Sequence, residues 1–403
     1  MRWYYSNRYI KLCSLGLLSA ALFLAACSKK DLPPVLPDPG PDTKAVVTPL
    51  DVDMPVIDTQ VLNFMALYGV PGASVAVVKD GRLVYARGYG LADTAAAEAV
   101  DTGSLFRIAS LSKFITTLGI MKLVEADSLE LTDKVFGTGA LLGSVLGTLP
   151  YPAYVEDITV EQLLRHEGGG WGNSSNDPAF AQSTLNLDQL VGWAIDNRPL
   201  GNAPGTYTDY SNLGFMILGR IIEKVSGQSY PDFIQQHVLT PSGVANMQMG
   251  ASSLAGRKPN EVRYYGQNGQ NPYGYNSNAF ARLGAAGAWI ASAIDIMRVM
   301  AHADGYTTVP DILAPATITT MSTPSTISNY AFGVRISTVN HNWYHGGSLS
   351  GTRTWMVRTY HGYSWAILLN TRNNTTAFNT ALDRLVWPAV NSSSTAWPNQ
   401  DLF

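Results

Sequence analysis

Apolar residues recur at strand-like spacing near both ends of the folded part of the chain and at helical spacing between them. Residues 73–90 contain two runs rich in β-branched and aromatic residues, joined at Lys79-Asp80-Gly81. Because Asp-Gly suits a tight turn, this stretch predicts a β-hairpin. Before it, residues 51–68 place apolar side chains at helical intervals, which predicts a helix.

Four helices are predicted in the middle of the chain. Apolar positions repeat with helical spacing over 110–125, 159–166, 213–227 and 292–303. The second of these begins with Thr159 and Gln162 in capping-box register, and the fourth begins with Ser292 as its cap. The third ends at Gly227, a typical helix stop.

Strand-like runs return near the end of the chain, at 330–337, 342–349, 352–359 and 363–370, followed by a helix near 377–386. Strands and one helix therefore flank a mostly helical middle. This order predicts an α/β (α+β) fold in which both ends of the chain build one sheet, with a helical subdomain inserted between them.

The composition of the 403-residue chain suits a globular protein, since 46% of its residues are hydrophobic. Its formal net charge is −3 and no run is rich in Lys or Arg, so we expect no nucleic-acid partner. Charged residues make up only 14%, whereas glycine, tyrosine and tryptophan are plentiful. This mixture favours a compact enzyme or binding protein.

The N-terminus is typical of a bacterial lipoprotein. Three basic residues precede an apolar stretch, 12–26, that is short for a membrane span and ends in Leu24-Ala25-Ala26-Cys27. This ending resembles a lipobox, in which the Cys27 thiol is lipidated after cleavage; an uncleaved anchor helix is the alternative. Because Ser28 rather than Asp follows, we expect the cell envelope, at the outer membrane, on its periplasmic or outer face.

Four segments follow from these patterns. Residues 1–27 form the signal peptide, 28–50 a Pro-rich linker, 51–390 the folded domain and 391–403 a polar tail. Both cysteines, Cys13 and Cys27, lie in the leader. The predicted mature domain therefore has no thiol for catalysis or metal binding.

Ser110 and Lys113 form a candidate reactive pair at the start of a predicted helix. Side chains at i and i+3 share a face, so Lys113 Nζ can reach Ser110 Oγ. A lysine whose pKa is lowered can serve as the base that activates a serine. A Ser-x-x-Lys pattern is expected about once by chance in a chain of this length. Taken alone, the pattern is better explained by a capping serine beside a solvated lysine.

Two further motifs stand downstream of this pair. Tyr210-Ser211-Asn212 comes immediately before a buried helix, and His345-Gly346-Gly347 lies within the C-terminal strands. Two adjacent glycines allow a ligand backbone to lie close along a strand edge. Separately, a surface tyrosine before a helix cap and a turn with an incidental histidine would explain them.

In this order, the three motifs resemble the signature of the serine β-lactamases and penicillin-binding enzymes: Ser-x-x-Lys, Ser/Tyr-x-Asn and Lys/His-x-Gly. Tyr210 makes the chain similar to class C β-lactamases and the related DD-peptidases and esterases. The resemblance covers most of residues 55–390, including "LLRHEGGGWG" and "VLTPSGVANM". It implies a β-lactamase/transpeptidase-like fold, an antiparallel sheet flanked by helices with an inserted helical subdomain.

The resemblance also implies a role for each catalytic residue. Ser110 would be the nucleophile that is acylated. Lys113 and Tyr210 would share the general-base work, with a cationic Lys113 lowering the pKa of the tyrosine. Tyr210 would then protonate the leaving group.

Four residues would bind the substrate. Asn212 would contact Lys113 and the substrate's amide oxygen, and His345 would replace the lysine often found in the third motif. Gly347 would lie against the substrate backbone. The backbone N–H of Ser348, with that of Ser110, would form the oxyanion hole.

One departure from the family pattern bears on the substrate. Gly346 stands where members usually carry a hydroxyl residue that helps to bind a carboxylate. Efficient recognition of penicillins or of terminal D-Ala carboxylates is therefore not expected, unless Arg353 or another cation compensates. The glycine argues against true β-lactamase activity. His166-Glu167 is not followed by a second histidine at helical spacing, so no metal is expected, and no other cofactor is implied.

The sequence therefore predicts a lipid-anchored, monomeric serine hydrolase that acts through an acyl-enzyme on a small-molecule or peptide substrate. D-amino-acid peptides are favoured, with β-lactams and short-chain esters as alternatives. An alternative of another class is a non-catalytic protein that binds peptidoglycan or penicillin.

Overall fold

The computed structural model describes residues 53–175 and 177–403. The predicted leader, Cys27 and the linker 28–50 lie outside the described residues. No helix in the described part of the chain is both long enough and apolar enough to cross a membrane.

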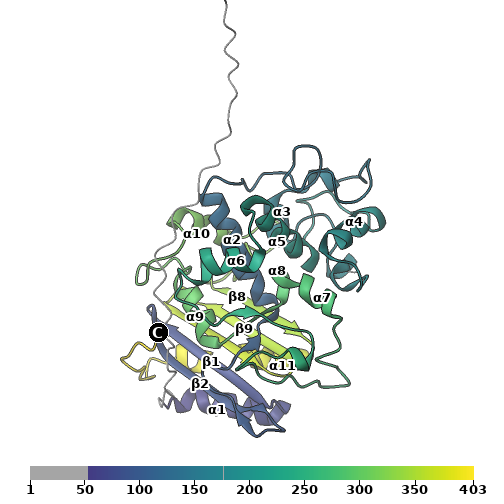
Figure 1. Ribbon diagram of the computed structural model, residues 1–403. Helices are drawn as coiled ribbons and strands as arrows, with labels where there is room; N and C mark the ends of the chain where they lie inside the picture. Colours follow the sequence, from purple (N-terminus) through teal and green to yellow (C-terminus); the bar gives the residue numbers. More distant parts are fainter. Residues whose placement is uncertain (1–52, 176) are drawn as a thin grey trace, which may run out of the picture.

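An antiparallel sheet of seven strands forms the lower half of the described molecule (Figure 1). Its spatial order is β3-β2-β1-β10-β9-β8-β7. The strands are β1 (Gly72–Lys79), β2 (Arg82–Asp93), β3 (Glu98–Ala99), β7 (Arg335–Ile336), β8 (Trp343–Leu349), β9 (Thr352–Arg358) and β10 (Tyr363–Leu369). β1 pairs with β10, so both ends of the chain build one sheet, which confirms the predicted fold class.

Most of the helices come from the middle of the chain and lie above the sheet (Figure 1). The helices are α1 (Pro55–Tyr68), α2 (Ser112–Glu125), α3 (Val160–Leu164), α4 (Leu187–Asn197), α5 (Asn212–Ser226), α6 (Tyr230–Ile234), α7 (Ser277–Arg282), α8 (Gly284–Gly287), α9 (Ala293–Ala301), α10 (Pro315–Ser322), α11 (Thr376–Asp383) and α12 (Trp387–Val390). A small second sheet is made of β4 (Phe106–Arg107), β6 (Trp289–Ala291) and β5 (Gln248–Met249).

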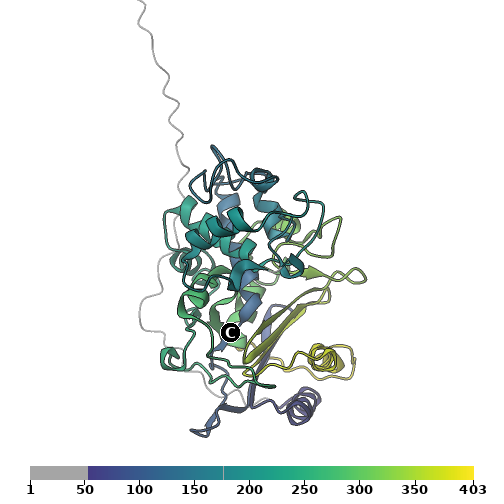
Figure 2. The same cartoon turned by 90° about the vertical axis from the view of Figure 1, so that its right-hand side faces the viewer.

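The two faces of the large sheet bury different cores, as the alternation of side chains along a strand requires. On one face, Val75 and Val77 of β1 pack with α1, α11 and α12. On the other, Ala76 and Val78 belong to the core that includes the inserted helices. Figure 2 shows α1 and α11 on one side of the sheet and the inserted helices on the other.

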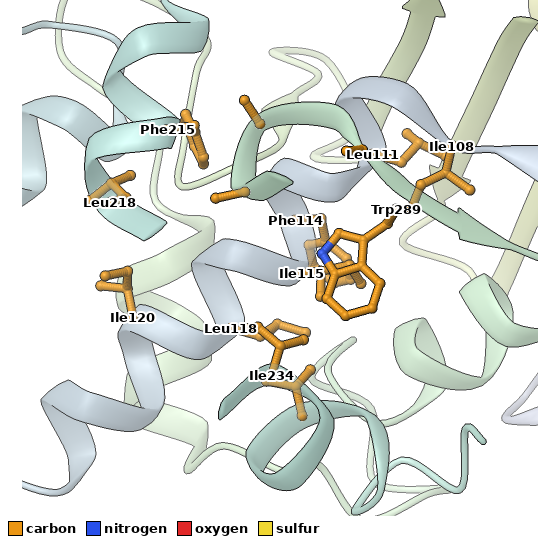
Figure 3. Close-up of a cluster of buried hydrophobic side chains, with 14 of the residues drawn as sticks. Ile108, Leu111, Phe114, Ile115, Leu118, Ile120, Phe215, Leu218, Ile234 and Trp289 are labelled. Atoms are coloured by element: carbon orange, nitrogen blue, oxygen red, sulfur yellow. The ribbon is translucent and has the colours of Figure 1, made fainter. Parts of the chain in front are cut away.

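Helix α2 runs through the centre of the larger core. Phe114, Ile115 and Leu118 are buried together with Phe215 of α5 and Trp289 of β6 (Figure 3). Eleven of the 14 residues of α2 are buried, so the helix has no solvent face of its own. Because α2 is packed on all sides, the side chains of its first turn are held in fixed positions.

The local sequence signals are borne out at several points. Asp80 and Gly81 have φ angles of 50° and 77°, the left-handed values that a tight hairpin turn requires. Both predicted capping arrangements form: Thr159 with Gln162 at α3, and Ser292, which exchanges hydrogen bonds with Asp295, at α9.

The last quarter of the chain differs from the prediction in two places. Of the strand predicted over 330–337, only β7 forms, because the chain turns at Gly333, whose φ is 69°, and Tyr330 pairs back with Arg335. The helix predicted near 377–386 ends at Asp383, and α12 follows with Pro388 in its first turn. The polar tail packs on β2, where the Leu402 N–H donates to the Leu83 carbonyl at 3.0 Å.

Candidate active site

Ser110 lies in a single 3-10 turn, Ala109–Leu111, that leads directly into α2. Its hydroxyl does not cap the helix, since neither this turn nor α2 has a side-chain cap. Instead, Lys113 Nζ donates to Ser110 Oγ at 3.2 Å. Ala109 holds a φ of 49°, rare for a residue with a side chain, directly beside the serine. The capping interpretation of Ser110 is therefore wrong.

Lys113 is completely buried at the base of this arrangement. Besides Ser110, its Nζ donates to Asn212 Oδ1 and to the Ala286 carbonyl, both at 2.8 Å. Burial lowers the pKa of Lys113 from 10.5 to about 7, and the charge of Asp177 opposes that shift. Near neutral pH a large fraction of Lys113 is therefore unprotonated and able to accept a proton.

Tyr210 lies beside the pair, immediately before α5, with Lys113 Nζ 4.9 Å from its ring centre. Burial raises the pKa of its hydroxyl well above 10, and Ser110 offsets this only in part. The expectation that Lys113 lowers the pKa of Tyr210 is therefore wrong: burial outweighs every neighbour, and Lys113 itself is only partly charged. The phenol is protonated at neutral pH.

His166 packs under Tyr210, with the two ring centres 4.3 Å apart. Its Nδ1 accepts a hydrogen bond from the Ser211 N–H at 3.0 Å. Burial and the nearby Lys113 hold the pKa of His166 well below 6.5. It is thus a neutral, structural support for the second motif.

Asn212, the first residue of α5, is held between Lys113 and Asp177. Its backbone N–H and its Nδ2 donate to the same carboxylate oxygen, Asp177 Oδ2, at 2.6 and 2.9 Å. The ionised Asp177 carboxylate can only accept, so it holds the Nδ2 end of the amide and leaves Oδ1 to accept from Lys113 Nζ.

His345 projects from β8 into the same buried cluster. Its Nε2 forms a short hydrogen bond with the hydroxyl of Tyr330. Burial, with Lys113 and Arg335 nearby, lowers the pKa of His345 to about 3. Unlike the lysine common in the family's third motif, this residue is uncharged at neutral pH.

A cleft of about 310 Å³ opens over Ser110, and Tyr210, Asn212, Gly346 and Ser348 line it. β7 pairs only with the start of β8, so the edge of β8 beyond Tyr344 is left open toward this cleft. The Ser337 N–H donates to the Asn342 carbonyl, so the backbone groups of Asn342 point toward the β7 side. Every second residue along β8 directs its N–H to that same side. By this alternation the Ser348 N–H points to the open edge, as the predicted oxyanion hole requires.

The two glycines of the third motif are explained by close packing. A Cβ at Gly347 would lie 2.3 Å from the Ile108 carbonyl, so glycine lets the turn that carries Ser110 approach β8. At Gly346 it would lie 2.8 Å from the Trp355 ring and 3.3 Å from Nη2 of Arg353. The contact of Gly347 with a substrate backbone stays a prediction.

The structure brings together Ser110, Lys113, Tyr210, Asn212, His345 and Ser348, which the motifs had placed far apart in sequence. Sequence reasoning missed Asp177 and Tyr330 as site residues, and neither lies in a pattern that could have singled it out. Within the described residues, no group of three or more His, Cys, Asp or Glu side chains could hold a metal ion.

A serine held against a lysine of lowered pKa, with a protonated tyrosine alongside, is the arrangement of an acyl-transferring serine enzyme. The family model for beta-lactamase matches residues 57–386. The chain belongs to this beta-lactamase family of serine hydrolases, related to the penicillin-binding proteins.

Two curated relatives match part of the chain. It is 31% identical over 185 residues to "Protein flp" of Staphylococcus aureus (strain MW2), a match that covers 46% of this chain and 36% of that protein. It is 30% identical over 209 residues to "Penicillin-binding protein 4*" of Bacillus subtilis (strain 168), covering 50% of this chain and 41% of the relative. The chain thus aligns with less than half of either relative.

Among solved structures, the D-amino acid amidase from Ochrobactrum anthropi SV3 superimposes with a TM-score of 0.68 at 20% identity. The match covers 84% of this chain and 99% of the amidase. At this identity the likeness supports the fold alone.

Proposed function

We propose that the protein hydrolyses peptides ending in a D-amino acid, through an acyl-enzyme formed on Ser110. The observation that carries the hydrolase part is Lys113 Nζ, which is buried between Ser110 Oγ at 3.2 Å and Asn212 Oδ1 at 2.8 Å. A buried amine with a pKa of about 7 is a competent base at neutral pH.

The roles of the acid and the base follow from the two environments. Unprotonated Lys113 accepts the proton of Ser110 as Oγ attacks the substrate carbonyl. The C–N bond then breaks, and the departing amine takes up a proton from the Tyr210 hydroxyl, which recovers one from Lys113. Water next attacks the ester, releasing the acid and restoring Ser110. The N–H groups of Ser110 and Ser348 would stabilise the oxyanion in both halves of this reaction.

Arg353 supports a substrate with a free carboxylate. Its guanidinium lies beside Gly346, which lines the cleft, and its Nη1 donates to the Gly347 carbonyl at 3.3 Å. Its Nε is buried without a hydrogen-bond partner among the described residues. None of the ion pairs in the described part of the chain involves Arg353 or its neighbour Arg372. Two cations without an acidic partner suit a carboxylate in place of the missing hydroxyl at position 346.

A matched pair of substrates tests this assignment. The same D-Ala-D-Ala peptide is offered with a free C-terminal carboxylate and as its carboxamide. We expect Arg353→Gln to raise KM for the acid about tenfold to a hundredfold, as the loss of a charge-assisted hydrogen bond implies, and to leave the amide nearly unaffected. Arg87→Gln, at a half-buried position on β2 that does not line the cleft, is the control. Equal effects on both peptides would contradict the carboxylate site.

Short-chain esters are a second candidate, since the apolar side chains Phe180, Leu283 and Leu349 line the same cleft. Turnover of nitrophenyl esters without turnover of either peptide would favour them. Penicillin hydrolysis would instead favour a β-lactamase. A folded protein that turns over none of these would support the non-catalytic binding alternative.

We further propose that the domain is monomeric and tethered to the cell envelope by a lipid on Cys27. The lipobox-like sequence before Cys27 supports the anchor. Metabolic labelling with a clickable fatty acid tests it: label should enter the wild-type protein and be absent from a Cys27→Ala variant. Equal labelling of the two would contradict the anchor.

A further inference from the structure

Asp177 has no place in the three motifs, yet it makes more contacts with the second motif than with its own turn. It stands just before the short turn Pro178–Phe180, and its Oδ1 accepts from the Ala179 N–H at 2.9 Å. Its other oxygen, Oδ2, accepts both the backbone N–H and the side-chain Nδ2 of Asn212.

This double contact fixes the orientation of the Asn212 amide. With Nδ2 held by Asp177, Oδ1 must face Lys113, where it accepts from Nζ at 2.8 Å. Rotation of the amide by 180° would set Nδ2 against the Lys113 amine and Oδ1 against a carboxylate. The contact between Oδ1 and the carboxylate would then be repulsive, so Asp177 excludes the alternative rotamer.

The charge of Asp177 also acts on Lys113 directly. Burial lowers the pKa of Lys113, whereas the carboxylate of Asp177 raises it. The other titratable groups facing Lys113 are Tyr210 before α5, His166 after α3 and His345 on β8. The two histidines are held neutral by burial and the tyrosine is held protonated. Arg335 and Arg353 act on Tyr210 and His345.

The position of Asp177 at the start of α5 favours its ionised form. The carboxylate contacts the first N–H of a 15-residue helix, the end at which the helix dipole stabilises negative charge. Burial raises the pKa of Asp177 above its ordinary value, and the N–H groups of Ala179 and Asn212 and the Lys113 amine offset this only in part. Among the described residues, Asp177 is the carboxylate whose charge acts on the Lys113 amine.

We propose that Asp177 is a positioning residue for acyl transfer, which orients Asn212 between the base and the substrate and supplies the counter-charge to Lys113. This inference rests on the proposed function. Through Asn212 it would keep the lysine aligned with Ser110 and leave the second Nδ2 hydrogen free for a substrate carbonyl.

Two variants separate the two roles. Asp177→Asn keeps an oxygen that can accept from Asn212 but removes the charge, together with the acceptor for the Ala179 N–H. Without the charge, the rise of kcat/KM with pH should move to lower pH. Asp177→Ala removes both the charge and the acceptor for Asn212. We expect kcat/KM for a nitrophenyl ester to fall by up to about a hundredfold, the size of loss that misplacement of a catalytic group causes.

A double-mutant cycle shows whether Asp177 acts through Asn212. In an Asn212→Ala background, Asp177→Ala should change kcat/KM by less than about threefold, because its partner is already gone. Asp196→Ala is the matched control: this carboxylate holds the Thr148 loop, accepting from the Thr148 N–H at 2.7 Å, away from the site. It should leave both the pH profile and kcat/KM unchanged. Thermal unfolding of each variant confirms folding.

The outcomes distinguish this inference from the proposed function. An unchanged pH profile in Asp177→Asn, or equal losses from Asp177→Ala in both backgrounds, would overturn the role of Asp177. If wild-type protein is not acylated on Ser110 by the ester, the proposed function itself is overturned.

Discussion

The ring of Trp355, on β9, occupies the space that a side chain at Gly346, on β8, would need. An ideal Cβ at position 346 would lie 2.8 Å from two carbons of that ring. The two residues are direct neighbours in the β8–β9 ladder, and Trp355 is fixed by a hydrogen bond from Nε1 to Asp383 at 2.9 Å. The glycine at the middle of the third motif is therefore a consequence of the tryptophan beside it.

Gly346→Thr, which restores the hydroxyl common in the family, should destabilise the protein by about 1–3 kcal/mol, the usual cost of overpacking. We expect no gain of penicillin hydrolysis. Urea unfolding measures the change, and Trp355→Leu in the same chain should recover part of the loss. A Gly346→Thr variant as stable as wild type would contradict the packing explanation.

The pH dependence of acylation should follow Lys113. Because burial lowers its pKa to about 7, kcat/KM for a nitrophenyl ester should rise as the pH passes through about 7 and then level off. Stopped-flow acylation between pH 5 and pH 9 measures this. A rate that is flat across this range would contradict the assignment of Lys113 as the base.

Ser112 offers an internal control for Ser110. It is fully buried, and its hydroxyl has no hydrogen-bond partner among the described residues. Ser112→Ala removes an unpaired buried hydroxyl, so we expect unchanged activity and a free energy of unfolding that is equal or up to about 1 kcal/mol higher. Loss of activity in this variant would contradict the assignment of Ser110, rather than Ser112, as the nucleophile.

Stability should fall in acid because His345 is buried in its neutral form. Its pKa is lowered to about 3 in the folded state, so between pH 6.5 and 3 the unfolded chain binds the additional proton. The stabilising contribution is complete above pH 6.5 and declines below it, by up to about 1.4 kcal/mol per pH unit. Burial also lowers the pKa of His166, so this histidine likewise reduces the stability of the folded protein in acid.

Urea unfolding at several pH values between 7 and 4.5 tests this account. His345→Gln should make the decline shallower, whereas His361→Gln, at an exposed position, should not change it. Parallel profiles for wild type and His345→Gln would show that His345 does not contribute.

The motifs Ser110-x-x-Lys113, Tyr210-x-Asn212 and His345-x-Gly347 could be found from sequence because each is short and local. The hairpin at Asp80-Gly81 and the caps at Thr159 and Ser292 were predictable for the same reason. These features depend only on nearby residues.

The supporting residues could not be found in this way. Asp177 contacts Asn212 across 35 residues, and Tyr330 meets His345 from a segment whose composition favours a strand. The pKa of Tyr210 was predicted in the wrong direction because burial, which only the folded chain defines, outweighs the effect of a neighbouring lysine.

The central claim is that Ser110 becomes acylated, and mass spectrometry of the labelled peptide tests it most directly. The protein is incubated with a fluorescent penicillin and, separately, with a fluorophosphonate, and is then digested. We predict that at least one reagent adds its mass to the peptide carrying Ser110, that Ser112→Ala is labelled equally, and that Ser110→Ala is not labelled. Folded wild-type protein without an adduct from either reagent, or with the adduct on another residue, would contradict the claim.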